Sequence, residues 1–160
     1  MSSICIAGMH RSGTSMVSRV LNLAGLYLGA DEKIMPPAPE NQEGFWEHLD
    51  IVAINEEVLA SIGAAWDFIP EFESGWETAD ALNSLYERAR EILQPFEKQE
   101  FWGWKDPRNS ITLPFWKHLL PDVKVILCVR HPLEVAQSLR SRNGSSIIFG
   151  LNLWYQYNLA

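Results

Sequence analysis

Cysteine and positive charge are both scarce in this chain of 160 residues, and each scarcity excludes a class of protein. The two cysteines, Cys5 and Cys128, each lie inside an apolar run typical of a strand, which favours small buried hydrophobes in a reducing compartment over a secreted disulfide scaffold. The 13 Lys and Arg are outnumbered by 20 Asp and Glu, giving a net charge of −7. That balance argues against a protein that binds nucleic acid or anionic membranes in general.

Long apolar runs are also missing. No stretch is long enough to span a bilayer and no signal peptide precedes Ile4, so we expect a soluble, cytoplasmic protein without a membrane partner. The hydrophobic content of 47% suffices for one globular domain, which we predict over residues 1–160. Residues 146–160 have a helical pattern that ends without a cap, which leaves two alternatives: a truncated chain, or a terminal helix docked on the core.

The most informative segment is residues 8–15, Gly-Met-His-Arg-Ser-Gly-Thr-Ser. It joins the apolar run 4–7 to a helical pattern formed by Met16, Val17, Val20 and Leu21. Strand, glycine-bounded loop and helix together hold a phosphate, because loop amides and the helix N-terminus point at one spot. The usual nucleoside-triphosphate loop ends in Gly-Lys-Ser/Thr, whereas here Thr14 takes the place of the lysine and Arg11 is the cation. The loop therefore predicts an anion site that differs from the ordinary site for ATP and magnesium.

The rest of the chain alternates helical and strand patterns, which predicts an α/β fold. We expect an irregular stretch over 31–45 (with Pro36, Pro37, Pro39 and Gly44), helices over 50–62, 78–94, 111–120 and 132–143, and strands over 101–105 and 123–129. Pro95 is expected to close the second of these helices. The strand 123–129 is almost wholly apolar, which is typical of a parallel strand with helices on both faces.

Basic residues follow all three predicted strands: Arg11 the first, Lys105 with Arg108 the second, and Arg130 the third. Since the carboxyl ends of parallel strands meet at one edge of a sheet, we expect these side chains to form a polyanion site. The alternative is that each is solvated or paired with a loop carboxylate. Arg130 stands where a magnesium site would place an acidic residue, and no metal-ligand cluster is evident, so the pattern favours a ligand held by protein cations without a metal. Asp106 is the one acid that could hold a metal at this edge.

Two of these segments resemble motifs of the sulfotransferase family. Arg-Ser-Gly-Thr at 11–14 resembles its 5′-phosphosulfate loop, and Arg130 followed by Ser138 resembles its 3′-phosphate motif. Both stand at a strand-to-helix junction in the right order, and segments 41–47 and 104–108 look like the bacterial branch of the family. The resemblance implies a three-layer α/β/α fold with a central parallel sheet, similar to P-loop NTPases.

The resemblance also implies a reaction: metal-independent, in-line transfer of a sulfuryl group from 3′-phosphoadenosine 5′-phosphosulfate to a hydroxyl or amine of a small-molecule or carbohydrate acceptor. Arg11 would stabilise the transition state, with Ser12, Gly13, Thr14 and Ser15 around the 5′-phosphate. Arg130 and Ser138 would bind the 3′-phosphate. Lys105 would contact the sulfuryl oxygens, the alternative being a salt bridge to Asp106 or a nearby glutamate.

The acceptor must lose a proton, and four residues are candidate bases. We favour Glu47, with Asp106, His48 and Glu43 as alternatives; Glu47 could also be an idle carboxylate at a helix N-terminus. The stretches 31–46 and 66–76 are expected to border the acceptor. Two other functions fit the same residues: a small-molecule kinase or nucleotide hydrolase with an atypical loop, and a non-catalytic nucleotide-binding module.

Overall fold

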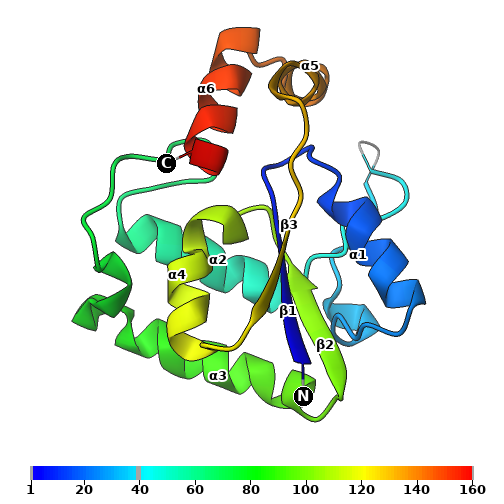
Figure 1. Ribbon diagram of the computed structural model, residues 1–160, viewed down its shortest axis with the longest axis vertical. Helices are drawn as coiled ribbons and strands as arrows, with labels where there is room; N and C mark the ends of the chain where they lie inside the picture. Colours follow the sequence, from blue (N-terminus) through cyan, green and yellow to red (C-terminus); the bar gives the residue numbers. More distant parts are fainter. Residues whose placement is uncertain (1, 39–40, 160) are drawn as a thin grey trace.

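Three parallel strands form the sheet in the computed structural model, which describes residues 2–38 and 41–159. β1 (Ser2–Ala7) lies in the middle, between β2 (Phe101–Lys105) and β3 (Lys124–Leu127). Each strand leads into a helix, and all three end at the same edge of the sheet (Figure 1). The predicted α/β fold with a central parallel sheet is therefore confirmed.

Helices form the outer layers. α1 (Thr14–Leu23) lies on one face of the sheet, and the opposite face is covered by α2 (Leu49–Ser61), α3 (Asn83–Glu97) and α4 (Asn109–Leu119) (Figure 1). α5 (Pro132–Asn143) and α6 (Ile147–Leu159) pack on each other beyond the carboxyl ends of the strands. Short 3₁₀ turns occur at Asp31–Lys33, Trp76–Thr78 and Asp80–Leu82. Pro39, part of the stretch expected to be irregular, lies outside the described residues.

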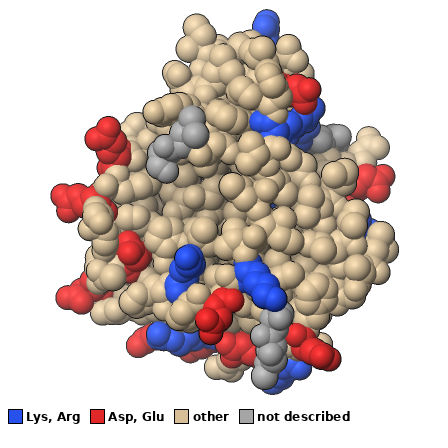
Figure 2. All heavy atoms as spheres, viewed as in Figure 1, with Lys and Arg blue, Asp and Glu red and all other residues tan. Residues whose placement is uncertain are grey.

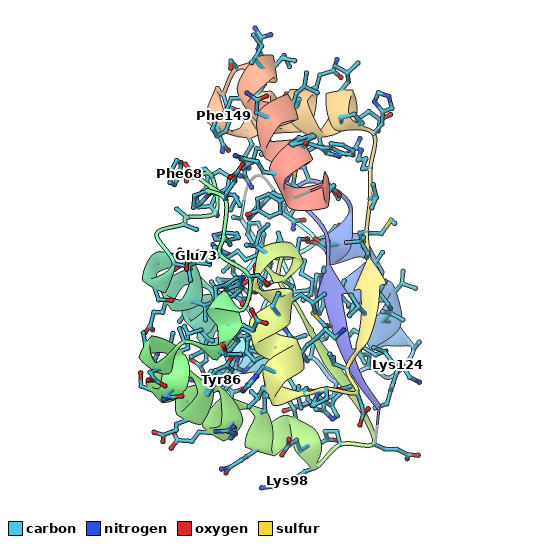
Figure 3. The ribbon with its side chains drawn as sticks, turned by 60° about the vertical axis from the view of Figure 1, so that its left-hand side comes forward. Phe68, Glu73, Tyr86, Lys98, Lys124 and Phe149 are labelled. Carbon is cyan, nitrogen blue, oxygen red and sulfur yellow. The ribbon has the colours of Figure 1, made fainter. Side chains whose placement is uncertain are left out.

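The alternation of side chains along β1 divides the core between the two faces of the sheet. Ile4 and Ile6 pack with Val17 and Leu21 of α1, whereas Cys5 packs on the opposite side among residues of α2, α3 and α4. On that second side Tyr86 of α3 stacks on Phe115 of α4, with ring centroids 4.3 Å apart (Figure 3). Both cysteines are free and buried, as the sequence predicted.

Two predicted boundaries of α3 are wrong. The helix begins at Asn83, after two 3₁₀ turns, and not at Thr78. Pro95 does not end it, since α3 continues to Glu97. A proline in the last turn removes one hydrogen bond, to the carbonyl of Glu91, and that residue is exposed, so water can take the place of the missing donor. Continuing the helix also buries Phe96.

β3 is less covered than its sequence predicts. Val125, Leu127 and Val129 are 40%, 57% and 58% exposed, although we expected helices over both faces of this strand. The described helices that pack on the sheet lie mainly over β1 and β2. The side chains of Val125 and Leu127 on β3 therefore remain open to solvent. The apolar run therefore predicts the strand correctly, but the prediction that both of its faces are buried is wrong.

α6 is docked on the rest of the domain. Its Gly150 lies so close to α5 that an added Cβ would come within 2.7 Å of the Cα of Ala136, and Leu153 and Tyr157 are buried. The indole N–H of Trp154 donates to the carbonyl of Arg130 at 2.9 Å, which ties α6 to the segment after β3. Among the described residues, no helix combines the length and apolar character needed to cross a bilayer.

Candidate functional site

The carboxyl ends of the strands open on a cavity of about 230 Å³. Its walls come from the loop after β1, from the segment before α2, and from the ends of β2 and β3. Its lining includes Arg11, Glu47, Lys105, Arg130, Arg142 and His10. The sequence-predicted cations therefore do converge, apart from Arg108, which is not among the lining residues described.

The loop after β1 has the geometry of an anion site. Gly13 adopts a left-handed conformation (φ 90°) at the N-cap of α1, and its side-chain position meets no atom within 4 Å. Among the residues that the structure describes, no side chain caps the first turn of α1, and that turn contains no acid, so its N–H groups and dipole are available to an anion. The hydroxyl of Ser12 is buried and accepts or donates no hydrogen bond within the described structure. Thr14 and Ser15 open the helix beside it.

Gly8 shapes the start of this loop. Its φ of 141° lies outside the range that other residues favour, and a Cβ there would come within 2.4 Å of the carbonyl oxygen of Cys128. Its N–H donates to the hydroxyl of Ser110 at 2.9 Å. The absence of a side chain at Gly8 thus lets the loop run directly beside the end of β3.

Lys105 and Glu47 form a buried ion pair in the lining of the cavity. The side chains are 1% and 7% exposed, and the ammonium donates to Glu47 Oε1, to the carbonyl of Phe45 at 2.8 Å and to the hydroxyl of Ser15 at 3.2 Å. Three donors thus meet three acceptors. Glu47 Oε2 accepts no hydrogen bond from the described residues. Burial raises the pKa of Glu47 and lowers the pKa of Lys105, since both charged forms lose water.

The four candidate bases occupy different places. Asp106 is fully buried and accepts hydrogen bonds from Asn55 at 3.0 Å and from the backbone and side chain of Arg108 at 2.9 and 3.1 Å, away from the described lining. His48 packs on Phe96 and borders a second hollow, and Glu43 borders a third. Glu47 alone of the four lines the cavity, as far as the described residues define it.

The segment after β3 brings the second motif to the first. Arg11 Nε donates to the hydroxyl of Ser138 at 2.8 Å, and Arg130 donates to the carbonyl of Arg11 at 3.3 Å. Arg130 also pairs with Glu134, one turn along α5, at 2.8 Å. The side chains of this second pair are 44% and 55% exposed. The two motifs, more than a hundred residues apart, therefore lie within hydrogen-bond distance of each other.

Two residues of the cavity were missed by the sequence analysis. Arg142 lies over the ring of Trp66, 5.5 Å from its centroid, and His10 meets the same ring edge-on at 5.0 Å. Burial, followed by the charges of Arg108 and Arg142, holds the pKa of His10 well below its usual range. Arg142 stands four positions after Ser138 on a predicted helix, a spacing that places both on one side and could have identified it.

The expected acceptor borders are partly at the cavity. Residues 31–46 contribute Asn41 and Phe45 to its lining, and residues 66–76 approach it through Trp66. Figure 2 shows a group of basic atoms beneath α5 with an acidic side chain directly beside it, and other basic side chains among acidic ones along the lower part of this face. Within the described part of the chain, no group of three or more His, Cys, Asp or Glu is placed to hold a metal ion.

Comparison with known proteins gives one result. A family model described as "Sulfotransferase family" matches residues 3–156, which is nearly the whole chain and includes every residue of the cavity named above. Comparison with curated proteins and with solved structures gives no match.

Proposed function

Because the chain belongs to the sulfotransferase family, we propose that it transfers a sulfuryl group from 3′-phosphoadenosine 5′-phosphosulfate to a hydroxyl or amine of a small-molecule or carbohydrate acceptor, without a metal. One observation carries this proposal: Arg11, Ser138 and Arg130 are linked at the open end of a cavity whose buried end holds Glu47 and Lys105. Arg11 and Arg130 offer cations for two separate phosphate groups of the donor. Glu47 offers a carboxylate to the acceptor.

The donor is held by its charged groups. The 5′-phosphosulfate lies at the N-terminus of α1, where the amides of Gly13, Thr14 and Ser15 are uncapped. The 3′-phosphate takes the guanidinium of Arg130 and the hydroxyl of Ser138, replacing the exposed contact between Arg130 and Glu134. ATP has no 3′-phosphate, so these two residues give the site its preference for the sulfuryl donor.

In the chemical step the acceptor oxygen bonds to sulfur while the bond from sulfur to the bridging oxygen breaks. Negative charge grows on that oxygen, and Arg11 with the loop amides stabilises it. The acceptor proton passes to Glu47, whose Oε2 has no other partner among the described residues. Its raised pKa makes Glu47 a stronger base than an exposed carboxylate. Lys105 holds Oε1 and thereby fixes the direction of the free oxygen.

Ligand-dependent thermal stability tests the proposal. A ligand at a hundred times its Kd stabilises the folded state by about 2.7 kcal/mol, so the melting temperatures with 3′,5′-adenosine bisphosphate, ATP with magnesium, and AMP rank the ligands directly. We expect the bisphosphate to give the largest shift without metal. Arg130→Ala should weaken bisphosphate binding about tenfold or more, because hydrogen bonds to a charged group are lost.

Arg140→Ala is the matched control, since Arg140 is an exposed arginine of α5, the helix that follows Arg130, and lies outside the described lining. It should bind the bisphosphate as the wild type does. A larger shift with ATP and magnesium would overturn the proposal in favour of a kinase or nucleotide hydrolase.

A further inference from the structure

Two residues other than glycine have a left-handed backbone in the described structure: one lines the cavity, and the other directly precedes Glu47, which lines it. They are Arg11 (φ 69°) in the loop after β1 and Trp46 (φ 65°), directly before Glu47. A bulky side chain disfavours this conformation, so it persists only where the surroundings hold it. Arg11 already has a role in the proposed function, whereas Trp46 has none, which makes its strain the feature to explain.

The backbone of Trp46 lies between two groups that contact the same ammonium. The carbonyl of Phe45 and the carboxylate of Glu47 both accept hydrogen bonds from Lys105, and the Phe45 carbonyl also accepts one from the Ser15 hydroxyl at 3.1 Å. Residues 44–47 belong to no helix or strand, so the backbone angles of Trp46 set the direction in which the chain continues from Phe45 to Glu47. The left-handed conformation of Trp46 therefore helps to set where the Glu47 carboxylate lies.

The Trp46 ring contacts both the residues just before it and helix α1, and these contacts hold the backbone at Trp46. Its indole N–H donates to the carbonyl of Glu43 at 3.0 Å, and the ring lies over Gly44 (φ 92°), where an added Cβ would be 3.4 Å from the indole nitrogen. From α1, the guanidinium carbon of Arg19 lies 4.7 Å from the ring centroid. The ring thus connects the segment before Glu47 to the helix whose N-terminus faces the cavity.

We propose that Trp46 is a positioning residue that holds Glu47 and the Phe45 carbonyl on Lys105, so that Glu47 Oε2 faces the acceptor. This inference rests on the proposed function, in which Glu47 accepts the proton. It is testable with water as acceptor. The water oxygen bonds to sulfur, and the bond from sulfur to the bridging oxygen breaks and leaves its electron pair on that oxygen. One water proton passes to Glu47 and the other is released to solvent. The products are sulfate and 3′,5′-adenosine bisphosphate.

Three variants at one position separate the ring from the backbone conformation. Trp46→Ala removes the ring and keeps the strain, Trp46→Gly removes both, and Trp46→Phe keeps an aromatic face for Arg19. Because a misplacement of about 1 Å can cost about a hundredfold in rate, we expect sulfate release to fall about tenfold or more in the Ala variant. The Gly variant should be faster than Ala, since glycine adopts a positive φ without strain, and Phe should be nearest to wild type. Bisphosphate affinity should stay within about twofold in all three, because Arg130 and Ser138, which hold the 3′-phosphate in the proposed function, contact Arg11 and Glu134 and not Trp46 among the described residues.

A merely structural role gives a different pattern. Glycine would then be no better than alanine, and bisphosphate affinity would fall in parallel with the rate; either result, or an Ala variant as fast as wild type, would overturn the inference. Failure of the wild type to bind the bisphosphate would instead reject the proposed function.

A second measurement judges the inference without the donor. Acetylation of Lys105 by acetic anhydride, followed by mass spectrometry, reports how well Glu47 and Phe45 cover the amine. Labelling should be about tenfold faster in Trp46→Ala than in Trp46→Phe, since about 1 Å of displacement breaks hydrogen bonds of this length. Arg19→Gln, an exposed change that leaves the backbone intact, should give a smaller increase, and Arg19→Lys should match wild type. Equal labelling in all variants would contradict the inference.

Discussion

The two ends of the cavity differ in burial, although both place a basic residue next to an acidic one. At the inner end Lys105 and Glu47 are almost fully buried, and all three ammonium protons have acceptors. At the outer end Arg130 and Glu134 are 44% and 55% exposed and lie one helical turn apart. A buried pair keeps its geometry because each lost contact leaves a charge without water, whereas an exposed pair exchanges partners at little cost. The inner end is therefore arranged for chemistry, and the outer end for capturing a ligand.

Replacing the inner carboxylate should have the largest effect on rate. Glu47→Gln keeps a hydrogen-bond acceptor for Lys105 and removes the base, so sulfate release from the donor should fall about 10²- to 10⁴-fold. Bisphosphate affinity should be unchanged, because the outer end is intact. In the wild type the rate should rise with pH through the raised pKa of Glu47, since the base works in its ionised form, and this limb should be absent in the variant. A variant with an unaltered rate would remove Glu47 from the mechanism.

Breaking the inner pair from the other side should have the largest effect on stability. Lys105→Met leaves the Glu47 carboxylate buried without its cation, which should lower the free energy of unfolding by about 3–5 kcal/mol in urea titrations. Removing both charges, in Lys105→Met with Glu47→Leu, should restore most of that loss, because no unpaired charge remains. If the double variant is no more stable than Lys105→Met alone, the loss of stability does not come from an unpaired Glu47 carboxylate in the interior.

The smallest effect is expected at the outer end. Glu134→Gln removes the carboxylate that competes for Arg130, so bisphosphate affinity should rise about two- to threefold, as expected for an exposed pair. Calorimetric titration at low salt measures the change, and Glu87→Gln, an exposed substitution on α3, is the control. A weaker affinity would mean that Glu134 orients Arg130 for the ligand and does not compete with it.

The sequence predicted those parts of the site that depend on local pattern. The loop from Gly8 to Ser15 and the basic residues after each strand follow from the strand-to-helix order, and the structure brings Arg11, Arg130 and Ser138 together. The partner of Lys105 was open between Asp106 and a glutamate, because adjacent residues at a strand end can face opposite sides. Asp106 turns inward to Asn55, and Lys105 turns to a residue 58 positions away.

The remaining differences have the same origin in tertiary contacts. The position of Glu47 against Lys105 depends on the left-handed backbone of Trp46, and residue type alone does not predict that conformation. The spacing of Arg142 from Ser138 places both on one side of the helix, but the contact of Arg142 with Trp66 joins segments far apart in the sequence and could not be predicted. The exposure of β3 depends on which helices stand over it, whereas its apolar sequence reports only that it is a strand.

The contact between Trp66 and Arg142 has an optical consequence. An indole against a guanidinium changes its fluorescence when the cation moves, and Arg142 lines the cavity into which an anion would be drawn. Trp104 and Trp116 are sealed in the core, so we expect their emission to change little when a ligand binds. Trp66 contacts two residues that line the cavity, so we expect its emission to report a bound anion, and Trp66→Phe identifies its share of the signal.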